Sequence, residues 1–415
     1  MGHLLMVESW VGSMSTLLPA GIGDAGHRFS FLTRDLGHYL HGRPGPHPLL
    51  GAANVLTAET NDEATLLPYV RRLHEALGFD GVLSSCDYYL PTVAAIAADL
   101  GLPGPGREAV AAACAKHRTR QVCSAAGVPG PAFAVVTDAA DALAAARRIG
   151  YPVVVKPVDL CGGMLVTRVE DDDALRAALD GIGAVPVNAR GQARATEVLV
   201  EECVRGPEFS VETVTARGVT TVVGVTDKTL TGAPAFIEAG HQFPAVLGPA
   251  EHEALTTTAR AAITALGLDD TVAHTEIVLT AAGPRLIEVN PRPAGNRITE
   301  LIRRVTGIDL AAVHADVAAG RTPDLTPRDT GIGSAAIAFA VPDTAGTLAA
   351  IAGTEGWDED PRVVEHRFAD PGTGVRPATN NNTYLGHAMV AVAAEGAAGP
   401  IARSLIEGLT IEVAR

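Results

Sequence analysis

The stretch HTEIVLTAAGPRLIEVNPRP, residues 274–293, decides the fold. Two runs that alternate apolar and polar residues flank AAGP, and this pattern predicts a β-hairpin that turns near Ala282. With that centre, Glu276 and Glu288 lie directly opposite one another, and Asn290 projects from the same face. Facing carboxylates repel unless a cation lies between them, and two carboxylates with an amide oxygen are ligands that suit Mg²⁺. The hairpin therefore predicts a magnesium site; the alternative is a solvated pair of glutamates on an exposed hairpin.

Two further segments offer positive charge to an anionic ligand. Arg292 follows the hairpin and adds a cation at the same edge, where negative charge on transferring oxygens would be stabilised. YPVVVKP, residues 151–157, ends a hydrophobic strand with Lys156, and the glycine turn of DLCGGM, residues 159–164, has free N–H groups that suit phosphates. No GxxxxGK[ST] pattern occurs there, so this is not a Walker A loop. The alternative is a solvated lysine before an ordinary loop.

A third segment, VLVEECVRGPEFSVETV at residues 198–214, combines a strand with several acids. Two glutamates follow the apolar run, a short Arg-Gly-Pro connection comes next, and Glu208 begins an alternating strand. A backbone hinge flanked by carboxylates can hydrogen-bond an adenine edge and ribose hydroxyls. Paired glutamates after a strand are otherwise usually surface residues.

Composition excludes several classes of protein. The 415 residues carry a net charge of −15, which argues against a nucleic-acid or anionic-membrane binder, because both need a basic surface. Five scattered cysteines without a CxxC pair indicate neither a disulfide framework nor a zinc site. No signal peptide or membrane span is predicted, so we expect a cytoplasmic protein. Of 32 basic residues besides histidine only three are lysines, Lys116, Lys156 and Lys228, which suggests a specific reason for each.

The order of predicted elements indicates several domains. Strands at 3–9, 27–34, 54–59 and 80–86 alternate with helices at 62–77 and 91–100, which is typical of a parallel βαβ sheet. A break, LPGPG, precedes one predicted helix over 107–126, a small α+β unit to about residue 200 and a larger β-rich unit to about residue 320. Short strands after residue 331 predict a β-rich appendage. We place the domains at residues 1–106, 107–200, 201–325 and 326–415.

Together and in this order, the segments resemble the ATP-grasp superfamily, and most of all its carboxylate–amine ligases, the branch of L-amino-acid ligases and carnosine-synthase-like enzymes. The resemblance covers essentially the whole chain and rests on AKHRTRQVCSAAGVPGP, YPVVVKPVDLCGG, VEECVRGPEFSVE, DKTLTGAPAFIEAGHQFPAVL with its GHxxP, the hairpin with NPRPAGNRI, and the C-terminal VPDTAGTL and PGTGVRP. It implies an α/β and α+β multidomain fold: a Rossmann-like parallel-sheet domain, a small lid, a central ATP-binding antiparallel sheet and a C-terminal β-rich domain. The glycine loop departs from the family pattern, because it carries Cys161 and Met164 where serine and glycine are usual.

The resemblance also implies a role for each candidate residue. Phosphates of ATP would be bound by Lys116, Lys156, Gly162 and Gly163, with Lys228 as a further contact; adenine by Glu201, Glu202 and Val204; ribose by Glu208; and Mg²⁺, or Mn²⁺, by Glu276, Glu288 and Asn290. Arg292 would stabilise the acyl phosphate and the tetrahedral intermediate, with His241 nearby. His241 is alternatively a hydrogen-bonded loop histidine without a catalytic role.

The implied reaction forms an amide or peptide bond. A substrate carboxylate, expected to be an amino acid, attacks the γ-phosphate of ATP, an amine attacks the acyl phosphate, and ADP and phosphate leave. Two alternatives stay open: a carboxylase or formyl-phosphate enzyme of purine or biotin chemistry on the same fold, and a nucleotide-binding module without turnover. Substrate specificity is expected around residues 8–15, 230–247 and 292–300. A homodimer is expected from the resemblance alone.

Overall fold

The computed structural model describes residues 1–40, 47–231 and 235–414. Its N-terminal domain is built on a parallel sheet with strand order β3-β2-β1-β4, as the alternation of strands and helices predicts. Its elements are β1 (His3–Val7), α1 (Met14–Asp24), β2 (Arg28–Thr33), α2 (Gly37–Leu40), the short 3₁₀ helices η1 (Pro48–Gly51) and η2 (Asp87–Tyr89), β3 (Asn54–Thr57), α3 (Glu63–Leu77), β4 (Gly81–Leu83) and α4 (Leu90–Leu100).

The predicted single helix over 107–126 is wrong, because the chain breaks it into α5 (Arg107–Cys114) and α6 (Lys116–Ala125). Ala115 is extended between them, with φ −110° and ψ 102°. Thr119 stabilises the break by donating its hydroxyl to the carbonyls of Ala112 (2.8 Å) and Ala113 (3.2 Å) at the end of α5. The break also positions Lys116, which begins α6 and whose amide N–H donates to Val158 O (2.9 Å) beside the glycine turn.

The lid subdomain that follows is a four-stranded antiparallel sheet, order β5-β8-β6-β7, with two helices packed on it. Its elements are β5 (Phe133–Val136), α7 (Ala139–Ile149), β6 (Val153–Pro157), β7 (Thr167–Val169), α8 (Asp172–Gly183) and β8 (Val198–Glu202). Val153, Val155 and Val200 are fully buried against Leu175 of α8, so the lid has its own small core.

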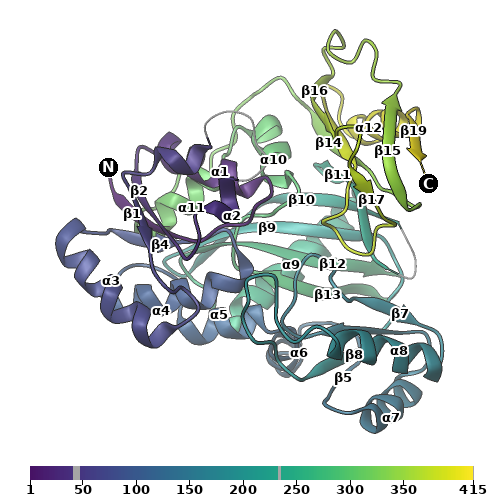
Figure 1. Ribbon diagram of the computed structural model, residues 1–415, viewed down its shortest axis with the longest axis horizontal. Coiled ribbons are helices and arrows are strands. Elements are labelled where there is room, and N and C mark those ends of the chain that lie inside the picture. The colour runs from purple at the N-terminus through teal and green to yellow at the C-terminus, as the bar shows by residue number, and fades with distance from the viewer. Residues whose placement is uncertain (41–46, 232–234, 415) are drawn as a thin grey trace.

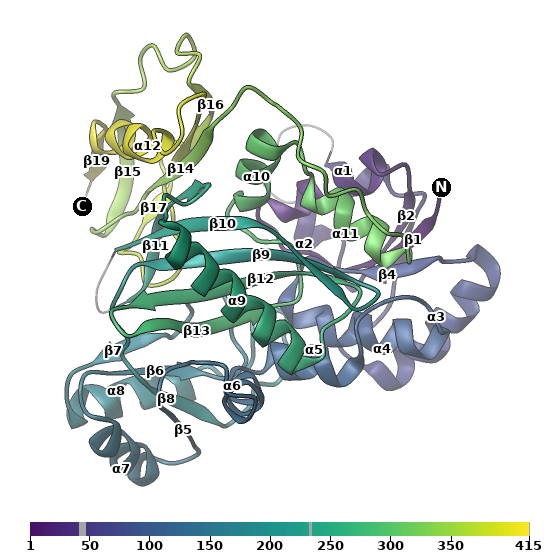
Figure 2. The ribbon, with the colours of Figure 1, turned by 180° about the vertical axis from the view of Figure 1, so that it is seen from behind.

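The central domain carries the long antiparallel strands and lies above the lid in Figure 1. Its elements are β9 (Glu208–Ala216), β10 (Val219–Thr231), β11 (Ile237–Phe243), α9 (Pro249–Leu266), β12 (Thr271–Thr280), β13 (Gly283–Asn290), α10 (Ile298–Thr306) and α11 (Leu310–Ala318). Helix α9 crosses the face of the sheet that is turned toward the viewer in Figure 2, and it buries Leu255, Ala259 and Ile263 against that face. Helix α11 packs on α1 of the N-terminal domain through Ala311 and Ala315, which fixes the two domains together.

The C-terminal region is β-rich as predicted, but much of it continues the central sheet instead of forming an appendage. Its elements are β14 (Ser334–Ala340), β15 (Gly346–Ala352), β16 (Val363–Phe368), β17 (Gly374–Val375), β18 (Gly386–Val392), α12 (Ala398–Glu407) and β19 (Thr410–Ala414). The central sheet runs β13-β12-β9-β10-β11-β14-β18-β16, and only β17, β15 and β19 form a separate sheet. Close approach at Gly240 permits the junction, because a Cβ there would lie 2.7 Å from Ile337 O. Among the helices described, none is long and apolar enough to cross a membrane.

Candidate active site

The hairpin β12–β13 places its two glutamates as the sequence predicts. Glu276 pairs with Glu288 across the antiparallel ladder. The turn itself is the two-residue link between Thr280 and Gly283, half a residue from the predicted centre, and Ile277 therefore pairs with Leu286. A β-bulge then inserts one extra residue on β13 and shifts the register so that the two glutamates face each other.

A buried lysine neutralises one side of this pair. Lys228 on β10 lies with its Nζ 2.6 Å from Glu276, 2.9 Å from Glu208 and 3.1 Å from Glu238, and its side chain is 1% exposed. Burial alone would lower the pKa of Lys228, but the three carboxylates raise it well above its ordinary value. Lys228, expected as a further phosphate contact, is thus the centre of an acidic cluster, and Glu208, expected at the ribose, is one of its members. Glu238 was missed, because only the pairing of β10 with β11 brings it here.

A second lysine neutralises the other side. Lys116 donates from Nζ to Glu288 Oε1 (3.0 Å) and to Leu160 O (2.6 Å) beside the glycine turn. Although burial opposes its charge, Glu288 holds the pKa of Lys116 above its ordinary value. When the Asn290 amide is oriented with its nitrogen toward these two carboxylates, it donates to Glu288 Oε1 (3.0 Å) and Asp87 Oδ1 (3.2 Å). Lys116, which the sequence placed in a separate segment and role, therefore contacts the hairpin glutamate Glu288.

These oxygens fit a magnesium ion. Two opposed carboxylates with an adjacent amide are hard donors of the kind that Mg²⁺ takes from proteins. Within the described ranges, no three His, Cys, Asp or Glu side chains gather closely enough to hold a metal by themselves. Mg²⁺ usually takes few protein ligands and completes its shell with phosphate and water, and the donor set Glu276, Glu288 and Asn290 suits such an ion.

His274 contacts Glu276 and a second, buried carboxylate. Its ring nitrogens lie 3.1 Å from Glu276 Oε1 and 2.8 Å from Oε1 of the buried Glu212, which also accepts from Ser210 Oγ (2.7 Å). Burial would lower the pKa of His274, but the two carboxylates raise it to about 10. His274 is therefore a cation at neutral pH, and it orients Glu276 toward the site.

Glu201 lies in a buried cluster of charged side chains. Its carboxylate lies 2.6 Å from Arg120 Nε and 2.6 Å from Lys156 Nζ, and its expected contact with adenine stays a prediction. Burial alone would raise its pKa, but the two cations hold the pKa of Glu201 below its ordinary value. Arg120 was missed as a site residue, although the K-x₃-R pattern of Lys116 and Arg120 contains it. Glu201 holds Lys156 at the site in this arrangement.

The hinge after β8 has the backbone geometry of a tight link. Glu202 is exposed and accepts from Ala132 N (3.1 Å), and Val204 N donates to Glu202 O (3.0 Å) within the link. Gly206 has φ +156° and lies so close to β12 that a Cβ would be 2.1 Å from Leu279 O. The hinge therefore lies against the hairpin strand that carries Glu276.

The backbone and the packing of the glycine turn explain why its sequence departs from the family pattern. Gly162 and Gly163 have φ of 66° and 71°, a left-handed backbone that favours glycine. Cys161 and Met164 pack with Tyr88 and Trp10 of the N-terminal domain. Burial raises the pKa of Cys161 to about 12, so its neutral thiol acts as a small apolar group.

Arg292 and His241 each lie beside a carboxylate. Arg292 donates from Nε to Asp87 Oδ1 (2.8 Å); burial would lower its pKa, but Asp87 raises it. Asp87, which also accepts from Trp10 Nε1 (2.9 Å), was missed, although it follows a parallel strand at the edge where such sheets bind ligands. His241 Nε2 lies 3.1 Å from Glu238 Oε2. Residues 232–234 of the expected specificity segment lie outside the described residues.

Three family models match the chain. They are an ATP-grasp N-terminal domain over residues 25–104, an ATP-grasp domain over residues 149–300 and an L-amino acid ligase C-terminal domain 2 over residues 338–414. The second model contains Lys156, Glu201 and the whole hairpin β12–β13.

Relatives and solved structures agree with these models. The chain is 30% identical to carnosine synthase 1 of Homo sapiens over 255 residues, 58% of this chain and 31% of that protein. It is 27% identical to alanine–anticapsin ligase of Bacillus subtilis over 260 residues, 59% of this chain and 54% of that protein. It therefore spans about half, or less, of the length of these curated relatives. The structure of an L-amino acid ligase from Bacillus licheniformis has the same fold, with a TM-score of 0.84, 23% identity and coverage of 100% of this chain and 99% of that one. The predicted family is confirmed: the chain belongs to the ATP-grasp superfamily and carries the C-terminal domain of the L-amino acid ligases.

Proposed function

We propose that this chain is an ATP-dependent carboxylate–amine ligase, which forms an amide or peptide bond and releases ADP and phosphate. The observation that carries the proposal is the pair Glu276 and Glu288, each held by its own lysine, with Arg292 at the end of the same hairpin. This puts hard anionic ligands and several cations within one site, as transfer of a phosphoryl group requires. The carboxylate substrate is proposed to be an amino acid, since the L-amino acid ligase domain at residues 338–414 favours that branch.

Separate residues are proposed to bind the metal and the phosphates. Glu276, Glu288 and Asn290 would hold Mg²⁺, or Mn²⁺, which when bound would supply positive charge to offset that of the phosphates. Lys116 and Lys156 hold ammonium groups at the base of the lid, where they offset phosphate charge.

The acyl-transfer step needs a donor for the developing oxyanion. Arg292 is fully charged and oriented by Asp87, so its remaining N–H groups are available to an oxygen at the hairpin end. His241, whose Nε2 lies 3.1 Å from Glu238 Oε2, is proposed to contact the substrate. Closure of the lid would keep water from the acyl phosphate.

The other two candidate functions have less support. A carboxylase or formyl-phosphate enzyme of the same fold would not need a C-terminal domain of the amino acid ligase type. A nucleotide-binding module without turnover would not need Arg292 paired and aimed beside the opposed glutamates. Cytoplasmic residence and a homodimer stay predictions, and gel filtration tests the second.

The test is ADP release from purified protein with ATP, Mg²⁺ and panels of amino acids and amines. We expect release only when a carboxylate and an amine substrate are both present, and Glu288→Gln should reduce it by at least about a hundredfold. Glu75→Gln, at an exposed position on α3, is the matched control and should change nothing. Unchanged turnover in Glu288→Gln would exclude the metal assignment. ADP release at the same rate with and without the amine substrate would exclude the ligase function.

A further inference from the structure

A hairpin projects from the lid toward the N-terminal domain. This lid prong, residues 186–194, lies between α8 and β8 and is closed by a bridge between Val187 and Ala193. The side chain of Asn188 accepts from the amides of Arg190 (2.9 Å) and Gln192 (3.1 Å), which fixes the tip. The prong is therefore a formed element that presents Arg190 outward from the lid.

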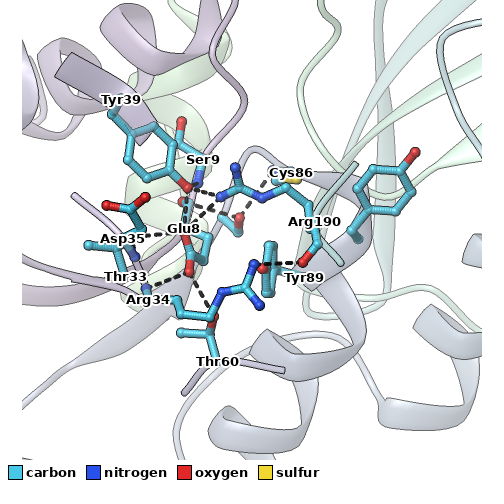
Figure 3. A network of polar contacts seen from close by, with 12 residues as sticks. Glu8, Ser9, Thr33, Arg34, Asp35, Tyr39, Thr60, Cys86, Tyr89 and Arg190 are labelled. Carbon is cyan, nitrogen blue, oxygen red and sulfur yellow. Dashed lines mark hydrogen bonds and ion pairs between the residues drawn. The ribbon is translucent and has the colours of Figure 1, made fainter. Parts of the chain in front are cut away.

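Arg190 is buried in the N-terminal domain instead of in solvent. Its guanidinium donates to Glu8 Oε2 (2.8 Å), and the two side chains are 7% and 1% exposed. It also lies over the rings of Tyr39 (5.2 Å to the centroid) and Tyr89 (5.4 Å), as Figure 3 shows. An arginine placed between a carboxylate and two aromatic faces is bound by charge, hydrogen bonding and cation–π contact together.

Glu8, which accepts from Arg190, is also held in place by groups of the N-terminal domain alone. Glu8 follows β1 with a left-handed φ of 52°, and its carboxylate accepts from groups of the N-terminal domain itself: Thr33 Oγ1 (2.9 Å), Arg34 N (2.8 Å), Thr60 Oγ1 (2.7 Å) and Tyr39 OH. Figure 3 shows these donors converging on Glu8. The N-terminal domain thus holds a preorganised anion at the carboxyl edge of its sheet, and a variant of Arg190 leaves that anion hydrogen-bonded.

Further contacts join the same two bodies. The carbonyl of Arg190 accepts from Asn61 Nδ2 (2.9 Å) and from the guanidinium of Arg34 (2.8 Å). Gln192 Nε2 donates to Asn61 Oδ1 (3.2 Å) and to Tyr88 O (3.2 Å). Tyr88 adjoins Asp87, the partner of Arg292, so the prong docks beside the group that orients the catalytic arginine.

We propose that Arg190 is a positioning residue that docks the lid onto Glu8 of the N-terminal domain and keeps it closed during acyl transfer. It touches none of the proposed phosphate or metal contacts. The inference rests on the proposed function in one respect: the closed lid protects an intermediate that water would destroy. Without the docking contact the lid opens more often, and ATP is spent without forming the amide.

The experiment compares Arg190→Ala, Arg190→Lys and the control Arg176→Ala. Arg176 lies on α8 of the lid and pairs with Asp173 of the same helix. We expect the ratio of ADP to amide to rise at least about tenfold in Arg190→Ala, to rise less in Arg190→Lys, and to stay at the wild-type value in Arg176→Ala. A purely structural defect would lower both products together and leave the ratio unchanged.

A second measurement does not depend on turnover. Hydrogen exchange at the amides of residues 186–194, without substrates, should accelerate at least about tenfold in Arg190→Ala and in Glu8→Gln, which also serves if the first variant fails to fold. Wild-type protein that makes no amide would refute the proposed function and leave this measurement intact. Unchanged exchange together with an unchanged product ratio would overturn the docking role.

Discussion

Replacing Glu201 with glutamine tests whether this residue is an internal counterion. The carboxylate is 3% exposed and lies 2.6 Å from both Arg120 Nε and Lys156 Nζ, whose side chains are equally buried. Glu201→Gln preserves the shape and leaves two buried cations without a counterion. Arg120 retains its bond to Ile287 O (2.7 Å), whereas Lys156 loses its carboxylate. Removing one partner of a buried ion pair costs about 3–5 kcal/mol, so we expect a loss of that size in the free energy of unfolding at pH 7.

The loss of stability in Glu201→Gln should also depend on pH in a defined direction. The cations hold the folded-state pKa of Glu201 below its unfolded value of about 4.3, so its stabilisation is complete above that pH and is lost as pH falls through the folded pKa. Glu201→Gln has no such contribution at any pH. The difference between wild type and variant should therefore be constant from about pH 5 to 7 and shrink below pH 4.

Urea unfolding at several pH values measures both quantities. The double variant Glu201→Gln with Lys156→Met removes one uncompensated cation and should show a coupling energy of about 1–3 kcal/mol between the two positions. Glu202→Gln, at the next, exposed position of the same strand, should stay within about 0.5 kcal/mol of wild type. A loss below about 1 kcal/mol in Glu201→Gln, or a loss that does not shrink in acid, would refute the counterion role.

Two further substitutions test the electrostatics and the packing. Burial would lower the pKa of His274, but neighbouring carboxylates raise it to about 10, so its contribution to stability is complete below about pH 6.5 and is lost as pH rises toward 10. In urea unfolding, His274→Gln should abolish that loss of stability at alkaline pH. An equal loss in the wild type and the variant would contradict this prediction. A Cβ at Gly81 would lie 1.9 Å from Ala318 O, so Gly81→Ala must push α11 off the sheet and should cost about 1–3 kcal/mol in the same assay. Gly51→Ala, where a Cβ meets nothing within 4 Å, is its control, and equal stabilities for the two variants would refute the close contact.

The parts of the site that follow from local pattern were predictable. The opposed pair Glu276 and Glu288 depends on alternation and on one turn, and a bulge compensated for the turn being half a residue from its predicted centre. The C-terminal strands were predicted as strands, but their place in the central sheet depends on pairing between β11 and β14, almost a hundred residues apart. Local pattern carries no information about such a partner. The break at Ala115 has the same origin, because a bond from Lys116 N to Val158 O, in another segment, supports it.

Partners of charged groups were the least predictable part, and the three lysines show why. Their scarcity indicated a specific purpose for each, and each ammonium is indeed buried against carboxylates: Lys116 on Glu288, Lys156 on Glu201 and Lys228 on three glutamates. An ammonium is a compact point charge, whereas the planar fork of arginine favours a fixed bidentate partner. Under the proposed function, Lys116 and Lys156, which hold carboxylates here, would turn toward a phosphate when nucleotide binds. Lys228, enclosed by its three glutamates, is suited to fixing those carboxylates in place instead.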